Sequence, residues 1–174
     1  MNLATLSWLN GESDEWRGMK IHHALAEHRF RDTVNAIGID PGRRWGMGIL
    51  IDGILYAYWG IMPSPDSAID YFDYIRDFIQ EWLPPKIPTN IVFVEGASYG
   101  EQFGQILLED IRFSFELAFK KRGFEVSLVP PKTARKVVLG NGNTKASEIW
   151  VKINSNGADG ACLALYGGGY KHKE

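Results

Sequence analysis

One short stretch decides the fold of this chain, because it joins an apolar strand to a carboxylate and a tight turn. It reads Ala36-Ile37-Gly38-Ile39-Asp40-Pro41-Gly42. We predict a strand over residues 34–39, and the Pro-Gly pair ends it. A carboxylate at the end of a buried strand costs free energy unless it meets a cation or a hydrogen-bonding partner. Asp40 is therefore the first candidate functional residue.

Two further acids occupy comparable places in the chain. Glu95 follows an unbroken apolar run at residues 91–94, which is typical of a central strand covered on both faces. Asp159 lies near the start of an apolar helix predicted over residues 157–166. Carboxylates that meet at one place suit a hard cation such as Mg²⁺, and this points to metal-assisted cleavage of phosphodiesters. Taken singly, each acid also has a structural explanation, as a turn residue, a strand-end charge or an acid at a helix N-terminus.

The remaining segments predict the partners of the first strand. Residues 46–51 and 54–59 form a hairpin around Asp52-Gly53, and residues 124–129 form a last strand. Helices are expected at residues 64–83, 101–122, 132–139, 145–153 and 157–166. This order predicts an α/β fold, a mixed five-stranded sheet flanked by helices on both faces. The strands ending at Asp40 and Glu95 become neighbours if they pair in parallel, and ligands collect at such strand ends.

The chain divides into an N-terminal extension at residues 1–33, a compact domain at 34–170 and a tail at 171–174. Within the extension we predict a helix over residues 14–30, with Trp16, Met19, Ala24 and Leu25 on one side. The neighbouring His22 and His23 are interpreted as surface residues, because no further metal ligand lies beside them.

The charge is uneven along the chain. The whole chain has a net charge of −2, but residues 120–152 hold eight Lys and Arg against two Glu. A local basic patch of this kind binds phosphate even when the whole chain is acidic. On charge alone, a solvated surface with cations near a helix C-terminus explains the pattern equally well.

Composition sets the broad class of the protein. The chain has 174 residues, of which 45% are hydrophobic, so we expect a single globular domain. The single Cys162 excludes a disulfide framework and a Cys-rich zinc site. No stretch approaches the roughly 18 apolar residues of a membrane span, and we find no signal-peptide pattern. We therefore expect a cytoplasmic protein, with no membrane association.

The order of the motifs resembles that of RuvC-type Holliday-junction resolvases, within the ribonuclease H-like superfamily. The resemblance spans about residues 34–167. Four stretches carry it: Ile37 to Gly42 with Gly46 and Gly48 after it, Val94-Glu95, Val129-Pro130 with residues 134–142, and Asn156 to Ala161. Each motif alone is weakly specific, and their order and spacing together are more so.

The resemblance implies a structure-selective endonuclease that resolves four-way DNA junctions by paired nicks, in recombination and repair. It implies a homodimer, branched DNA as the partner, two Mg²⁺ or Mn²⁺ ions per active site and no small-molecule cofactor. The implied catalytic and metal-binding residues are Asp40, Glu95, Asn156 and Asp159. The implied DNA-binding residues are the cations Arg135, Lys136 and Lys145, and the aromatics Tyr99 and Phe103 for stacking in the opened junction.

Asn156 departs from the family pattern, which usually has an acid there. Residues 156 and 159 share one face of a helix, so both can reach one site. An asparagine offers a neutral oxygen and cannot act as a base. Either this lineage works with Asn156, or the chain is a catalytically weakened form that still binds junctions.

Two other resemblances are weighed on the sequence alone. A YqgF-like RNA nuclease shares the shape of the first motif, and Arg43-Arg44 resembles its basic residues. An actin-like nucleotide-binding fold shares the early acid and glycine hairpin, but this chain is too short for two such lobes.

Overall fold

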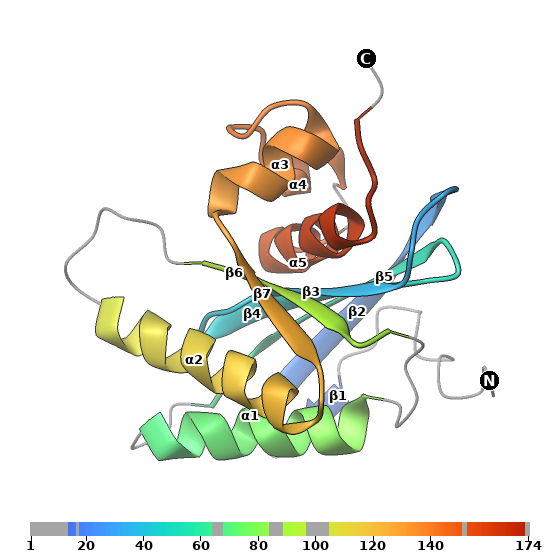
Figure 1. Cartoon of the computed structure of the whole chain (residues 1–174). Helices are drawn as coiled ribbons and strands as arrows, with labels where there is room; N and C mark the ends of the chain where they lie inside the picture. Colours follow the sequence, from blue (N-terminus) through green and yellow to red (C-terminus); the bar gives the residue numbers. More distant parts are fainter. Residues whose placement is uncertain are drawn as a thin grey trace.

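The computed structural model builds one open mixed sheet of seven strands, with helices on both faces (Figure 1). It describes residues 14–16, 18–63, 68–83, 89–96, 105–150 and 153–172. The strands are β1 (Asp14–Trp16), β2 (Met19–Arg29), β3 (Ala36–Asp40), β4 (Arg44–Ile51), β5 (Ile54–Ile61), β6 (Ile91–Glu95) and β7 (Glu125–Val129). Their order across the sheet is β1-β2-β5-β4-β3-β6-β7.

Helices cover the two faces in two groups, as Figure 1 shows. The helices are α1 (Ala68–Trp82), α2 (Gln105–Lys121), α3 (Pro131–Leu139), α4 (Ala146–Ile149) and α5 (Ser155–Gly167). One face carries α1 and α2, whose core includes Phe78, Phe115 and Phe119. The other carries α3, α4 and α5, with a second core around Leu163 and Leu165. Within the described residues, no helix is long and apolar enough to cross a membrane.

The pairing of β3 sets the geometry of the candidate site. It pairs antiparallel with β4 on one side and parallel with β6 on the other, with Ile39 opposite Val94. The next residues along the two strands are Asp40 and Glu95, so the two acids leave the sheet at the same edge. The predicted Asp52-Gly53 turn is present, with φ of 52° and 75°, as a type I′ hairpin requires.

Helix α5 lies very close to the sheet because small residues line their contact. A Cβ atom added to Gly38, Gly46 or Gly48 would meet the α5 backbone, at Ala164, Asn156 and Gly160 respectively. The side chain of Asn154 caps the helix by accepting from the Asn156 backbone N–H at 3.0 Å. Close packing and a cap together fix where the first turn of α5, with Asp159 after it, meets the strands.

The helix predicted over residues 14–30 was wrong, because this segment forms β1 and β2. Strand β2 pairs antiparallel with β5, from Lys20 opposite Ile61 onward. Met19 and Ile21 are buried while Lys20 is exposed, which is the two-residue alternation of a half-buried strand. Because β1 and β2 belong to the same sheet as the later strands, the chain is not divided into two structural units at residue 33. The five predicted strands are all present, and residues 14–29 add two more.

The predicted helix at residues 145–153 is also shorter than expected. Helix α4 covers Ala146–Ile149 only, and residues 151–152 lie outside the described part of the chain. The first four residues of the predicted helix at 101–122 likewise lie outside it, and α2 begins at Gln105.

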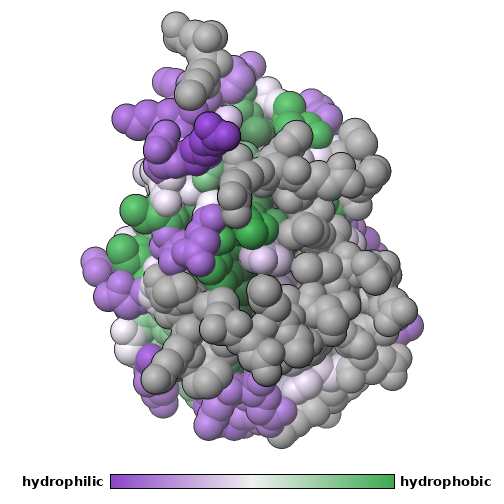
Figure 2. Space-filling model, turned by 90° about the vertical axis from the view of Figure 1, so that its right-hand side faces the viewer, coloured by the Kyte–Doolittle hydropathy of each residue, from purple (hydrophilic) through white to green (hydrophobic). Residues whose placement is uncertain are grey.

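The face at the right-hand side of Figure 1 is turned to the viewer in Figure 2. Hydrophilic side chains lie near the top and along the bottom of this view, with apolar atoms between them. Its apolar surface is thus interrupted by polar groups.

Candidate active site

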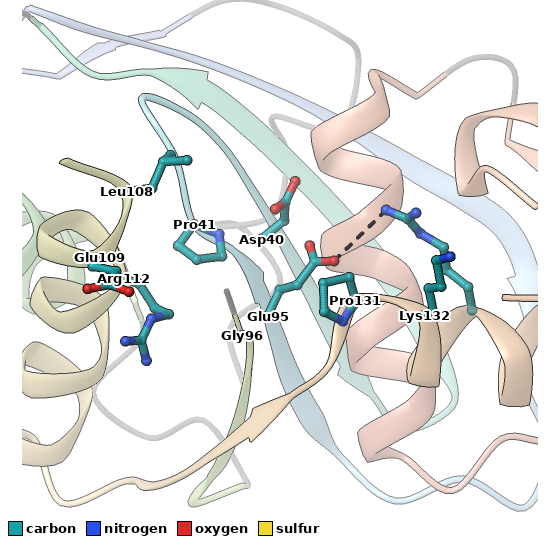
Figure 3. Close-up of a pocket in the computed structure, with 10 residues that line it drawn as sticks. Asp40, Pro41, Glu95, Gly96, Leu108, Glu109, Arg112, Pro131 and Lys132 are labelled. Carbon is teal, nitrogen blue, oxygen red and sulfur yellow. Dashed lines mark ion pairs between the residues drawn. The ribbon is translucent and has the colours of Figure 1, made fainter. Parts of the chain in front are cut away.

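Two acids from neighbouring strands and a third from α5 meet at one edge of the sheet. Figure 3 shows Asp40 and Glu95 side by side at the ends of β3 and β6. Asp159 lies close to them, because Arg135 forms ion pairs with both Glu95 and Asp159. The sequence made these two acids neighbours on the condition that their strands pair in parallel, and β3 and β6 do so.

The two strand-end carboxyl groups repel each other when both are ionised. Desolvation raises the pKa of Asp40 well above its ordinary value, and the adjacent Glu95 carboxylate raises it further. Desolvation also raises the pKa of Glu95. A pair of this kind holds a proton between its members unless a cation balances the charge.

Arg135 supplies part of that positive charge. Its Nε donates to Asp159 Oδ1 at 3.0 Å, and its Nη2 lies 3.9 Å from Glu95 Oε1. The dashed line in Figure 3 marks the second of these ion pairs. Arg135 projects from α3, a helix that starts at Pro131 directly after β7. Arg135, which is predicted to contact DNA, contacts two of the acids in this structure.

A cavity of about 430 Å³ opens beside these acids. Residues of α2 line one side of it and residues of α3 the other (Figure 3). The lining residues are Asp40, Pro41, Glu95, Gly96, Leu108, Glu109, Arg112, Pro131, Lys132 and Arg135. Sequence reasoning did not assign Arg112 or Lys132 to the site. Arg112 has Glu116 one helical turn away, a spacing that suggests an ordinary surface ion pair.

The chemistry of Asp40 and Glu95 fits a divalent cation. Both present oxygen ligands to the cavity, and a bound cation would stabilise the ionised carboxylates that burial disfavours. Asp159 faces Arg135, and the described residues contain no cluster of three or more His, Cys, Asp or Glu side chains arranged to hold a metal. Asp40 and Glu95 line the cavity and could hold such an ion, and Asp159 lies beside them with its Oδ1 paired to Arg135.

The other predicted site residues lie outside the cavity. Asn156 is half-buried in the first turn of α5, while Lys136 on α3 and Lys145 just before α4 are exposed. None of the three lines the cavity. Tyr99 and Phe103 fall outside the described residues, so their predicted stacking role stays a prediction.

Comparison with known proteins places the fold. No protein-family model and no curated protein matches this sequence. The structure matches that of Thermus thermophilus RuvC with a TM-score of 0.56 and 18% identity, over 76% of this chain and 92% of that one. The chain has a RuvC-like fold.

A second match is T. thermophilus RuvC in complex with a Holliday junction substrate. Its TM-score is 0.55 at 16% identity, and it covers 76% of this chain and 90% of that one. The RuvC-like fold confirms the predicted α/β class with its mixed sheet and helices on both faces. At this identity the likeness concerns the fold.

The raised carboxyl pKa values predict an unusual dependence of stability on pH. The folded protein holds protons on these acids more tightly than the unfolded chain does. Their contribution to the free energy of unfolding is therefore complete below about pH 4 and is lost as the pH rises through the raised values. Urea unfolding in EDTA at several pH values should show this loss, and Asp40→Asn should make it smaller. If the unfolding free energy of the natural protein and that of Asp40→Asn depended on pH in the same way, the role given to Asp40 in this loss would be contradicted.

Proposed function

We propose that this protein is a metal-dependent endonuclease that resolves four-way DNA junctions by paired nicks. The observation that carries the proposal is the meeting of Asp40 and Glu95 at one end of two parallel strands, with Asp159 beside them. Three cations line the same cavity: Arg112, Lys132 and Arg135. The RuvC-like fold supports it, since T. thermophilus RuvC has been solved with a Holliday junction substrate. The proposed setting is DNA recombination and repair.

In the proposed reaction, Asp40 and Glu95 would hold Mg²⁺ or Mn²⁺. A divalent ion bound there supplies an activated water and stabilises the leaving oxygen of the phosphodiester. Asp159 would complete the ligand set after its ion pair with Arg135 opens, and two ions per site are part of the proposal. The released Arg135 guanidinium would then neutralise phosphate charge.

The exposed cations Lys136 and Lys145 would bind the DNA backbone outside the cavity. Tyr99 and Phe103 keep the stacking role that the resemblance implies. These assignments predict salt-dependent binding to junctions, because each phosphate contact releases a counterion.

Paired nicks need two active sites, so we propose a homodimer. Helix α2 presents exposed Leu108 and Phe113, which are 52% and 57% accessible. The neighbouring aromatics Phe115 and Phe119 belong to the core of the domain, and do not contribute to such a surface. The exposed pair supports α2 as the place to look for the dimer contact.

Asn156 decides how active the natural chain is. We expect Asn156→Asp to raise Mg²⁺ affinity and the cleavage rate on the order of tenfold, because it adds a carboxylate one helical turn before Asp159. The measurement is cleavage of a labelled four-way junction in Mg²⁺, with binding followed in Ca²⁺.

Three results of that experiment are informative. Symmetric nicks by the natural chain establish a resolvase that works with Asn156. Junction binding without nicking, with cleavage restored in Asn156→Asp, identifies a catalytically weakened junction-binding form. Preference for structured RNA over junctions in both proteins contradicts the proposal and favours the YqgF-like alternative.

A further inference from the structure

Arg112 is an unusual residue of the cavity wall. It projects from α2, and its side chain is only 21% accessible. Its Nε is fully buried and finds no hydrogen-bond partner among the described residues. Buried polar groups are almost always paired in folded proteins, so an unpaired guanidinium N–H calls for an explanation.

Its ion-pair partner does not account for its position. Arg112 Nη1 lies 3.8 Å from Glu116 Oε2, while Lys120 Nζ contacts Oε1 of the same glutamate at 2.6 Å. Lys120 therefore already neutralises Glu116 on the same helix, at the shorter distance. The charge of Arg112 is left available to the cavity.

The opposite wall carries a second available cation. Lys132, in the first turn of α3, is exposed and lines the same cavity, and no ion pair connects it to another described residue. Figure 3 shows Arg112 and Lys132 on opposite sides of the Asp40 and Glu95 pair. Arg135 is engaged with Asp159 and Glu95. Among the described residues, Arg112, whose ion pair with Glu116 is long, and Lys132 are therefore the cavity cations best placed to meet an anion.

The rest of the lining limits what that anion can be. Pro41, Pro131 and Leu108 add apolar surface, and Glu109 adds one more negative charge on the α2 side. A highly charged polyphosphate would be repelled by Asp40, Glu95 and Glu109 more strongly than a singly charged group. A phosphodiester carries one charge per group and has an apolar sugar beside it, and Arg binds such a group with two parallel hydrogen bonds.

We propose that Arg112, together with Lys132, forms a subsite for a backbone phosphate next to the one that is cut. The subsite holds one nucleic acid strand between α2 and α3 and sets which phosphodiester lies against Asp40 and Glu95. This inference rests on the proposed nuclease function, and it adds a positioning contact that the acids and Arg135 do not provide.

The test compares Arg112→Gln and Arg112→Lys with a matched control, Lys121→Gln. Lys121 lies on the same helix with its Nζ 5.1 Å from the centre of the Phe72 ring, and it does not line the cavity. Binding of a labelled four-way junction and of a single-stranded oligonucleotide is measured in Ca²⁺ over a range of salt. Single-turnover cleavage in Mg²⁺ and the melting temperature are measured for each protein.

We expect Arg112→Gln to weaken binding roughly tenfold, as the loss of one charge-assisted hydrogen-bonded contact does. The slope of log affinity against log salt should fall by about one. Arg112→Lys should recover the salt slope and part of the affinity, Lys132→Gln should lower both, and Lys121→Gln should leave both unchanged. A melting temperature close to that of the natural protein shows that Arg112→Gln is folded. If Arg112→Gln does not fold, the comparison of Arg112→Lys with the natural protein still tests the subsite.

Failure of this inference can be told apart from failure of the proposed function. Unchanged affinity, salt slope and cleavage rate in Arg112→Gln overturn the subsite while leaving the nuclease intact. A natural protein that neither prefers junctions nor cuts them overturns the proposed function. In that case, a lower salt slope for the oligonucleotide in Arg112→Gln still supports the phosphate subsite.

Discussion

Replacing Asp40 by asparagine should lower the single-turnover rate of junction cleavage in Mg²⁺ on the order of a thousandfold or more. Asp40 and Glu95 are the two carboxylates placed to hold a divalent ion, and asparagine supplies one neutral oxygen in place of a charge. Junction binding in Ca²⁺ should persist, since the substitution removes a negative charge that faces the DNA backbone. The rate and the affinity are measured on the same labelled junction.

The same substitution should stabilise the metal-free protein. It removes a buried carboxyl group whose pKa is raised by desolvation and by the neighbouring Glu95. The melting temperature in EDTA at neutral pH should therefore rise, by about 2–4 °C for each kcal/mol of unfolding free energy gained. Added Mn²⁺ should raise the melting temperature of the natural protein much more than that of Asp40→Asn, because ion binding stabilises the folded state.

Asp52→Asn is the matched control for Asp40→Asn. Asp52 lies in the turn between β4 and β5 with φ of 52°, a conformation that asparagine tolerates, and it does not line the cavity. This variant should cut junctions at the natural rate. Cleavage by Asp40→Asn at the same rate as Asp52→Asn would remove Asp40 from the proposed active site.

The second large effect is expected at Gly46, where α5 touches β4. A Cβ atom on Gly46 would overlap the carbonyl group of Asn156 and lie 2.7 Å from Gly157 N. Both are backbone atoms and cannot move aside by changing rotamer, so α5 has to shift. We expect Gly46→Ala to lower the free energy of unfolding by about 3 kcal/mol or more, measured by urea denaturation.

Gly96→Ala provides the comparison for stability. Its Cβ would meet Val129 O at 3.5 Å, an ordinary contact, so the change in unfolding free energy should stay below about 1 kcal/mol. The Gly46 substitution should also disturb the site, because the helix that shifts carries Asp159. Equal stability of Gly46→Ala and Gly96→Ala would contradict the close packing of α5 on the sheet.

Local patterns in the sequence were sufficient for much of the sheet. The apolar runs before Asp40 and Glu95 and the Asp52-Gly53 turn are signals carried by neighbouring residues, and each element appears at or near the predicted place. The sequence left open whether the two strands ending in acids pair in parallel, because β4, β5 and α1 lie between them in the chain.

The N-terminal segment shows where local patterns are not enough. Met19, Lys20 and Ile21 alternate as in a strand, but the segment from Trp16 to Leu25 also allowed a helix. The strand became the stable choice because β5 has an open edge with unpaired backbone groups, which β2 satisfies by pairing along it. That edge exists only once the sheet has formed.

The acidic residues of the site were thus determined by the sequence, and their partners by the tertiary structure. Asp40 and Glu95 end strands, and the parallel pairing of β3 with β6 makes them neighbours. The pairing of Arg135 with Asp159, at a separation of 24 residues, and the placing of Arg112 opposite Lys132 depend on how α2, α3 and α5 pack around that edge. Side chains on separate helices meet through packing in three dimensions, and no spacing along the chain records it.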